Sequence, residues 1–248
     1  MLSKTHFSRI RSLHLKKNRD AADVFIAEGS KVVMELLGSG KFLCRELIVA
    51  SEWLSRHSDA PVLAHTSLIS VAGADQLNAL SLLQKNQEVI GLFRRANIPD
   101  EPTVEGITLI LDGIRDPGNL GTLIRTADWF GLGAIICSHD TVDCYNPKVV
   151  QSAMGSMARV DVHYADLTGW LIKYPEIPVY AAVPGGRPVR ELGQIKEGFL
   201  IIGSESHGIR PELLSLATQR VGIPGAGTAE SLNAAVAAGI LLSYLSGR

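Results

Sequence analysis

The sequence predicts an α/β protein whose second half is a mostly parallel sheet with helices on both faces. From Ile107 onward, short apolar runs of strand type alternate with segments of helical periodicity. The runs are nearly continuous in Val, Ile and Leu, which is typical of strands buried on both faces. Four of them lead into loops rich in glycine, at residues 112–118, 184–186, 203–208 and 224–230.

The composition is that of a globular protein. The chain has 248 residues, of which 46% are hydrophobic and 20% charged, and a formal net charge of −1 that favours no class of partner. Its three cysteines, Cys44, Cys137 and Cys144, are odd in number and lack CxxC spacing, which fits a reducing compartment and no metal cluster. The N-terminus lacks the apolar core of a signal peptide, and the most apolar segment, 234–242, is shorter than the about 20 residues that span a bilayer. We therefore expect a soluble, cytoplasmic protein with no metal and no membrane partner.

Residues 1–95 form a smaller predicted α/β domain. A helix is expected over 3–19, a second after Ser30 as its cap and a third over 67–83. Strands are expected at the following ranges: 24–28, 47–50, 61–64 and 88–93. Residues 96–106, which contain Pro99 and Pro102, are predicted to be a linker to the domain at 107–248.

Basic residues are concentrated at the start of the chain. They are Lys4, Arg9, Arg11, Lys16, Lys17 and Arg19, with Asp20 the single acid among the first twenty residues. Such a cluster is expected to attract phosphates, such as those of a nucleic acid, and we take these six as candidate phosphate contacts. A solvated helix face is the equally simple alternative.

The elements of the second half follow from its periodicity. Strands are predicted at 107–111, 134–137, 159–163, 178–183, 199–202 and 220–223, the third of them at an edge of the sheet. Helices are predicted from Asn119, at 148–154, 167–173 and 211–216, and at 231–245. Asn119 and Ser231 are of the residue types that cap helices.

The glycine-rich loops predict a ligand site, because loops after parallel strands meet at one edge of the sheet. Neither the G-x-G-x-x-G dinucleotide fingerprint nor a phosphate loop ending in Gly-Lys-Ser/Thr is present, so a nucleoside-like ligand held by backbone groups is favoured. Ser206 resembles a hydrolase nucleophile, but Ser204 stands where that motif needs glycine. Its neighbour His207 adjoins it in sequence, which is not the spatial pairing of a catalytic triad.

Two polar residues near helix starts are candidates for chemistry. Arg125 lies near the start of its helix, whereas the helix dipole favours cations at the end, so it is either a solvated surface residue or an anion clamp. Asn233 heads a helix whose next nine residues are apolar or Gly. A buried amide there must tie loops together or hold a ligand. The small residues that follow also permit close packing against another helix, as at a dimer interface.

Three motifs of the second half together resemble those of the SpoU-type (TrmH-like) RNA 2′-O-methyltransferases of the SPOUT superfamily. They are Asn119-x-Gly121-x-x-x-Arg125-x-Ala127-x-x-Phe130-Gly131, Gly203-x-Glu205-x-x-Gly208 and Ile223-Pro224 followed by Ser231-Leu232-Asn233. The first domain, through Phe25–Gly29 and Gln87–Gly91, is similar to the L30e-like substrate-binding domain that often precedes such a catalytic domain.

The resemblance implies S-adenosylmethionine as methyl donor, a ribose 2′-hydroxyl of RNA as acceptor, a homodimer formed through the C-terminal domain, and a trefoil knot in that domain. It implies cofactor contacts, made largely through the backbone, by Gly203, Ile223, Leu232, Ala182, Val183 and Pro224. It implies a reaction site lined by Asn119, Arg125, Glu205, Ser231 and Asn233. The family usually has Met where this chain has Gly225, and often Gly where it has Ser206.

Family association favours ribosomal RNA as the substrate. The alternatives are transfer RNA as substrate and a non-catalytic RNA-binding protein on the same fold. A methyltransferase acting on small molecules would leave the basic residues at the start of the chain unexplained.

Overall fold

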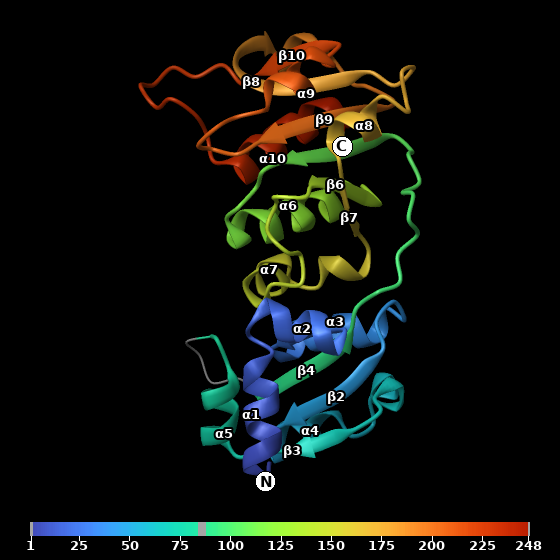
Figure 1. The fold of residues 1–248 in the computed structure, drawn as a ribbon, viewed down its shortest axis with the longest axis vertical. Helices are drawn as coiled ribbons and strands as arrows, with labels where there is room; N and C mark the ends of the chain where they lie inside the picture. Colours follow the sequence, from blue (N-terminus) through green and yellow to red (C-terminus); the bar gives the residue numbers. More distant parts are fainter. Residues whose placement is uncertain (1, 84–87, 248) are drawn as a thin grey trace. The chain divides into compact units, whose positions relative to one another are not determined.

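The computed structural model describes residues 2–83 and 88–247, and the chain divides into two compact units. Gln87, part of a motif noted above, lies outside the described residues. The first unit comprises the residues up to Ile98 together with Tyr145–Ala158, and the second comprises Pro99–Cys144 and Arg159–Arg248. Each is described by itself (Figure 1).

The first unit contains a four-stranded sheet in the order β1-β4-β2-β3. Its strands are β1 (Val24–Glu28), β2 (Cys44–Val49), β3 (Ile69–Val71) and β4 (Val89–Arg94). β4 is antiparallel to both β1 and β2, while β3 lies parallel to β2 at the edge. All five residues of β1 are buried, as expected for a strand covered on both faces.

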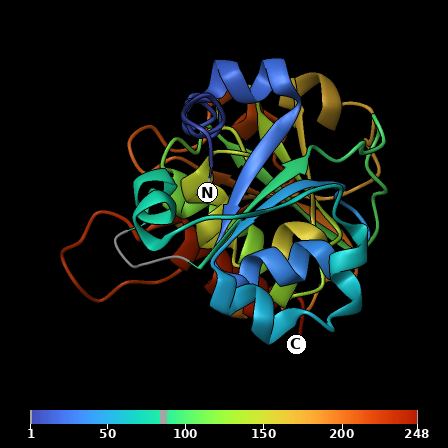
Figure 2. The same cartoon turned by 90° about the horizontal axis from the view of Figure 1, so that it is seen from below.

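Helices cover both faces of this sheet (Figure 2). The helices of the unit are α1 (Lys4–Ser12), α2 (Lys16–Ala22), α3 (Ser30–Gly38), α4 (Ser51–His57), α5 (Ala74–Leu80) and α7 (Pro147–Ala153), with 3-10 turns η1 (Pro61–His65) and η2 (Ser156–Ala158). Ile10 of α1 and Leu77 of α5 share a core with Ile26 and Ile90 of the sheet. Because side chains alternate along a strand, Phe25 faces the other way, where its ring contacts Phe42.

The structure corrects four local predictions for this unit. The helix expected over 67–83 is replaced by the strand β3 and the shorter helix α5. The strand expected at 61–64 is a 3-10 turn begun by Pro61, and β3 at 69–71 pairs with β2 instead. The basic helix is interrupted between α1 and α2. Ser30 does not cap α3, because Gly29 holds the cap position with φ at 87° and the Ser30 hydroxyl accepts a hydrogen bond from Trp53 Nε1 (3.0 Å).

The segment Tyr145–Ala158 packs with the first unit, although it lies within the second domain predicted from the sequence. α7 lies against β1 and buries Val149 and Val150. The ring centroids of Tyr145 and Phe25 are 4.9 Å apart. Amphipathic periodicity predicts that such a helix buries a face, but it does not say which neighbour receives that face.

The second unit is built on a six-stranded sheet in which every pair is parallel, in the order β10-β8-β9-β5-β6-β7. Its strands are β5 (Ile107–Asp112), β6 (Ala134–Ser138), β7 (Asp161–Ala165), β8 (Val179–Pro188), β9 (Gly198–Gly203) and β10 (Gln219–Gly222). Its helices are α6 (Pro117–Trp129), α8 (Leu167–Leu171), α9 (Pro211–Ser215) and α10 (Ala234–Leu245), with the 3-10 turn η3 (Val189–Glu191). The predicted parallel sheet is confirmed, as is the edge position of β7.

Alternation along the strands divides the core of this unit into two layers. Ile110, Ile136 and Phe199 pack with Trp170 of α8 and Leu213 of α9. Their sequence neighbours face the opposite layer, where α6 and α10 pack against each other over β6 and β9 (Figure 1). The sheet is therefore covered on both faces, as predicted.

Both predicted helix caps of this unit are corrected. α6 begins earlier than expected, because Pro117 stands at its first turn and Asp116 Oδ1 accepts from the backbone N–H of Asn119 (2.9 Å). α10 is capped by Asn233, whose side-chain oxygen accepts from the N–H groups of Ala235 and Val236, and not by Ser231. The amide of Asn119 is thereby left available for other contacts.

No helix within the described residues is long and apolar enough to cross a membrane.

Candidate active site

The predicted loops follow neighbouring strands at one edge of the second sheet. Strands β10, β8, β9 and β5 are adjacent in that order, and all run parallel. In the pairing of β8 with β10, Ala181 opposes Arg220 while Arg187 opposes Val221, so residues 182–186 leave the ladder as a bulge. This bulge contains the predicted residues Ala182 and Val183, both half-buried.

Two glycines permit backbone contacts that no other residue allows. A Cβ on Gly203 would lie 2.2 Å from the backbone carbon of Gly208, and the N–H of Gly208 donates to the carbonyl of Ser204 (2.8 Å). A Cβ on Gly186 would lie 2.5 Å from the backbone carbon of Val221. Backbone therefore packs directly on backbone beside the predicted cofactor loops, which is where a ligand held by main-chain groups would bind.

A carboxylate and two amides from the three motifs meet in one cluster. Asn119 Nδ2 donates to Glu205 Oε1 (2.7 Å), and Asn233 Nδ2 donates to Asn119 Oδ1 (2.8 Å) and to Glu205 Oε1 (3.1 Å). The backbone N–H of Ala234 also donates to Glu205 Oε1 (3.3 Å). We call Asn119, Glu205 and Asn233 the amide cluster.

The amide cluster ties together the start of α6, the loop after β9 and the start of α10. The side-chain oxygen of Asn233 is occupied by its own helix N-terminus, and that of Asn119 by Asn233. Within the described residues, Glu205 Oε2 receives no hydrogen bond, which leaves it open to a ligand. The three side chains of the amide cluster therefore hold one another in place, and Glu205 Oε2 can still accept a hydrogen bond from a ligand.

The other two predicted reaction-site residues do not join this cluster. Arg125 is exposed and lies six residues beyond Asn119, about 9 Å along the axis of α6. Its guanidinium has no hydrogen-bond or ion-pair partner among the residues that the structure describes. Ser231 is exposed in the loop before α10. Both are free to meet a ligand, and neither is held in place by a neighbour.

The remaining predicted cofactor residues lie in and beside the same loops. Ile223 and Gly203 are half-buried, Pro224 is exposed, and Leu232 keeps 46% of its surface exposed. A Cβ on Gly225, the position at which this chain departs from the family pattern, would meet no atom within 4 Å. A larger residue would therefore fit there, and glycine is not required by packing.

The basic residues at the start of the chain divide into two kinds. Lys4, Arg9, Arg11, Lys16 and Lys17 are exposed, with Arg9 and Lys16 within 3.5 and 3.0 Å of acid oxygens. Arg19 is only 2% exposed, and its guanidinium donates to the carbonyls of Leu13 (3.2 Å) and His14 (2.9 Å). Arg19 is therefore removed from the candidate RNA contacts, because its buried charge holds the turn between α1 and α2.

The sequence did not reveal an ion-pair network beside the loop that carries Glu205, where Asp112 of β5 pairs with Gly203 of β9. Asp112, 2% exposed at the end of β5, accepts from Arg210 Nε (2.7 Å) and from the backbone N–H of Arg210 (2.8 Å). Arg210 also donates to Asp140 (2.9 Å). The hydrogen bond to Asp112 raises the pKa of Arg210, and hydrogen bonding by the Ser138 hydroxyl, with the nearby guanidinium, lowers the pKa of Asp140. An acid at the end of an otherwise apolar strand was the signal that could have revealed it.

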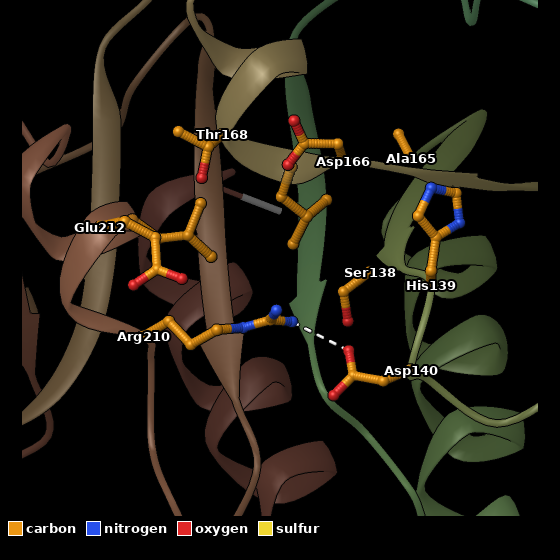
Figure 3. A pocket seen from close by; sticks show the side chains of 10 residues that line it. Ser138, His139, Asp140, Ala165, Asp166, Thr168, Arg210 and Glu212 are labelled. Atoms are coloured by element: carbon orange, nitrogen blue, oxygen red, sulfur yellow. Dashed lines mark hydrogen bonds and ion pairs between the residues drawn. The ribbon is translucent and has the colours of Figure 1, made fainter.

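A cavity of about 360 Å³ opens beside this network (Figure 3). Its walls come from the ends of β6 and β7 and from the starts of α8 and α9. The lining residues are Ser138, His139, Asp140, Ala165, Asp166, Leu167, Thr168, Arg210, Glu212 and Leu213. In the described part of the chain, no three His, Cys, Asp or Glu side chains come together as a possible metal site.

Comparisons with known proteins agree with this arrangement. Residues 106–243 match the family model for the SpoU rRNA Methylase family, and residues 5–91 match the MRM3-like substrate binding domain. The 23S rRNA (guanosine(2553)-2′-O)-methyltransferase RlmP of Bacillus subtilis is 33% identical over 96% of this chain and 94% of its own length.

Solved structures give the same result. A TrmH-family protein from Porphyromonas gingivalis has a TM-score of 0.86 at 36% identity, covering 100% of this chain and 99% of its own. An AdoMet-bound rRNA methyltransferase from Sinorhizobium meliloti has a TM-score of 0.85 at 30% identity, covering 98% of this chain and 95% of its own. With its three motifs placed at one sheet edge and its whole length matched, the chain belongs to the SpoU rRNA methylase family.

Proposed function

We propose that this protein transfers a methyl group from S-adenosylmethionine to a ribose 2′-hydroxyl of structured RNA, with ribosomal RNA as substrate. The observation that carries the proposal is the amide cluster, which joins the three family motifs at the sheet edge. It is supported by the relative from Bacillus subtilis, named as a 23S rRNA 2′-O-methyltransferase, and by the AdoMet-bound relative from Sinorhizobium meliloti.

The loops of the second unit fit S-adenosylmethionine. Residues 182–186, 203–208 and 223–232 follow three adjacent strands, and the close backbone contacts at Gly186 and Gly203 leave main-chain groups beside an open edge. Gly203, Ile223 and Leu232 would hold the cofactor through their backbones, with Ala182, Val183 and Pro224 beside them. When bound, S-adenosylmethionine supplies a methyl group activated by a positively charged sulfur.

Arg125 and the amide cluster would position the acceptor. A ribose hydroxyl is a weak nucleophile, and good positioning can contribute about 7–11 kcal/mol to the reaction. The guanidinium of Arg125 is always protonated near neutral pH, so we assign it to a bidentate grip on the RNA phosphate next to the ribose. The hydroxyl proton then passes to a phosphate oxygen or to water. Ser231, exposed in the loop before α10, would contact the same substrate.

The first unit would supply RNA affinity through the exposed basic residues of α1 and α2. Lys17→Ala should reduce the slope of log K against log salt by about 0.7–0.9 and leave folding unchanged, because one phosphate contact is lost. Arg19→Ala should instead leave the salt slope of RNA binding unchanged and lower the free energy of unfolding by about 1–3 kcal/mol, because the carbonyls of Leu13 and His14 lose their hydrogen-bond donor. Filter binding at several salt concentrations and urea unfolding test both. An unchanged salt slope in Lys17→Ala would remove this residue from the RNA surface.

We further propose a homodimer formed through the second unit, a trefoil knot in that unit, and a cytoplasmic location. Exposed apolar side chains support the dimer: Trp129 at the end of α6 is 83% exposed, and Val236 and Tyr244 on α10 are 50% and 51% exposed. Sedimentation tests the dimer: the wild type should sediment as a dimer and Tyr244→Glu, which places a charge on this surface, as a monomer. A monomeric wild type would contradict the proposal. The resemblance to the family supports the knot, which a crystal structure would test. The three buried free cysteines suit a reducing cytoplasm, and cell fractionation tests that location.

The central test has two parts. Calorimetry with S-adenosylmethionine should give saturable binding, and total RNA from a strain lacking the gene should lose one 2′-O-methyl site that the purified protein restores. Loss of a site in transfer RNA would redirect the proposal to that substrate. Binding of RNA without binding of S-adenosylmethionine and without methylation would identify a non-catalytic RNA-binding protein.

A further inference from the structure

The cavity beside the Asp112–Arg210 ion pair is separate from the predicted cofactor loops. None of its lining residues belongs to 182–186, 203–208 or 223–233. It nevertheless adjoins the loop that carries Glu205, because Arg210 comes two residues after Gly208, at the end of that loop. At 3.8 Å per residue, its backbone can lie no more than about 8 Å from that loop. A ligand here would therefore lie at the edge where the reaction is proposed to occur.

The cavity has an apolar floor and a polar rim. Leu167 and Leu213 line it and also belong to the core, with 4% and 1% of their surface exposed. Figure 3 shows Thr168 and Glu212 projecting from the helical side, and Ser138, His139 and Asp140 from the strand side. A flat group that is apolar on its faces and polar at its edges matches this lining, and nucleobases are of that kind.

The charge of the cavity decides which groups it accepts. In and beside the cavity, negatively charged side chains outnumber positively charged ones. The acids are Asp140, Asp166, Glu212 and the adjoining Asp112, and the cations are Arg210 and Arg115, which lies 3.8 Å from Asp140. A phosphate would be repelled here, whereas a group that donates hydrogen bonds would be attracted.

The acceptors still available are on the helical side. The carboxylate of Glu212 accepts no hydrogen bond from the residues that the structure describes. Asp166 uses Oδ2 to accept from the N–H of Gly169 (3.2 Å), so it keeps one oxygen. Thr168 and His139 can donate, and they line the same cavity.

Guanine is the base that fits this pattern. Its N1–H and 2-amino groups are adjacent donors that one carboxylate can accept together, while its O6 and N7 accept from groups such as Thr168 and His139. Adenine, cytosine and uracil each present fewer donors on that edge. We propose that this cavity, which we call the base pocket, receives a guanine of the substrate RNA, splayed out of the strand at or next to the methylated nucleotide and held by Glu212.

The inference rests on the proposed function, so its test separates the two. The full-length protein, saturated with S-adenosylhomocysteine to fill the donor site, is titrated with guanosine and with inosine, which lacks only the 2-amino group, and binding is followed by ligand-observed NMR. We expect guanosine to bind about 10-fold more tightly than inosine, because inosine leaves the carboxylate of Glu212 partly unpaired. Glu212→Gln should abolish this preference. Glu197→Gln, a change at an exposed glutamate outside the pocket, should retain it.

A second arm uses RNA carrying the mapped methylation site. Inosine at the methylated position or at one of its two neighbours should lower kcat/KM about 10-fold in the wild type and have no effect in Glu212→Gln. Methylation that no inosine substitution alters, or a guanosine preference that survives in Glu212→Gln, would overturn the base pocket while leaving the methyltransferase intact. A guanosine preference that depends on Glu212, in a protein that methylates no RNA, would instead overturn the proposed function and leave a guanosine site.

Discussion

Removing the carboxylate of Glu205 gives the sharpest test of the amide cluster. Glu205→Ala removes three hydrogen bonds, from Asn119 Nδ2, Asn233 Nδ2 and the backbone of Ala234. Each is charge-assisted but partly exposed, so we take a net value of about 1 kcal/mol for each, or about 2–3 kcal/mol in all because they share one acceptor. If this energy is used to hold the reaction site in order, the rate of methyl transfer should fall about 30- to 150-fold.

Glu205→Gln should have a smaller effect. Its amide keeps one oxygen that can accept from the two asparagines but carries no charge, so about half of the energy remains and the rate should fall about 5- to 10-fold. Because the cluster is exposed, water can replace the lost partners, and the free energy of unfolding should change by less than about 1 kcal/mol in either variant.

The assay is single-turnover methyl transfer to RNA with S-adenosylmethionine at saturation, together with urea unfolding of each variant. Glu176→Ala, at an exposed glutamate outside the site, is the matched control and should behave as the wild type. A Glu205→Ala enzyme within twofold of the wild-type rate would refute the reasoning. A loss of 2–3 kcal/mol in unfolding free energy would show that the hydrogen bonds stabilise the fold and not the reaction geometry.

Three further predictions concern charged residues of the second unit. Arg125→Ala should lose most turnover in the methyl-transfer assay and keep cofactor affinity in calorimetry. Arg125→Lys should fall between it and the wild type, and near-wild-type activity would exclude the bidentate phosphate grip. Arg210→Met should lower the free energy of unfolding by about 2–4 kcal/mol in urea, because it leaves the buried Asp112 without its counter-ion, and a loss below 1 kcal/mol would contradict that account. Because the pKa of Asp140 is lowered in the folded protein, its ionised carboxylate stabilises the fold. This stabilisation is complete above the ordinary pKa near 4 and is lost as the pH falls through the lower pKa of the folded state. Relative to Asp140→Asn, the wild type should therefore lose up to about 1 kcal/mol on acidification below pH 4, and parallel pH profiles would contradict this.

Local signals were sufficient for most elements and for bringing three of the five predicted reaction-site residues into one cluster, whereas the roles of Arg125 and Ser231 stay predictions. The apolar runs at 107–111 and 199–202 are strands, and the motif residues Asn119, Glu205 and Asn233 meet as their motifs imply. Prediction failed where two local signals compete. Pro61 stands in an apolar run that resembles a strand, yet it begins a 3-10 turn.

Charge alone also misled at one position. Arg19 belongs to a basic cluster in sequence but is buried, because the turn between α1 and α2 exposes carbonyl groups that need a donor. The base pocket has no sequence signature, since its walls come from three separate stretches around 138–140, 165–168 and 210–213. Only a chain folded so that β6, β7 and α9 are neighbours brings them together.

The sequence by itself determined the α/β class, the parallel sheet and the motifs that place this chain among the SpoU methylases, because strand periodicity, glycine loops and motif spacing are local properties. Tertiary structure decided that Tyr145–Ala158 packs with the first unit and that Asp112 pairs with Arg210. Those outcomes depend on which groups compete for the same donor or the same apolar surface. Such competition involves residues far apart in the sequence, such as Asp112 and Arg210, 98 positions apart, and Lys41 and Met157, 116 positions apart, and no local pattern records it.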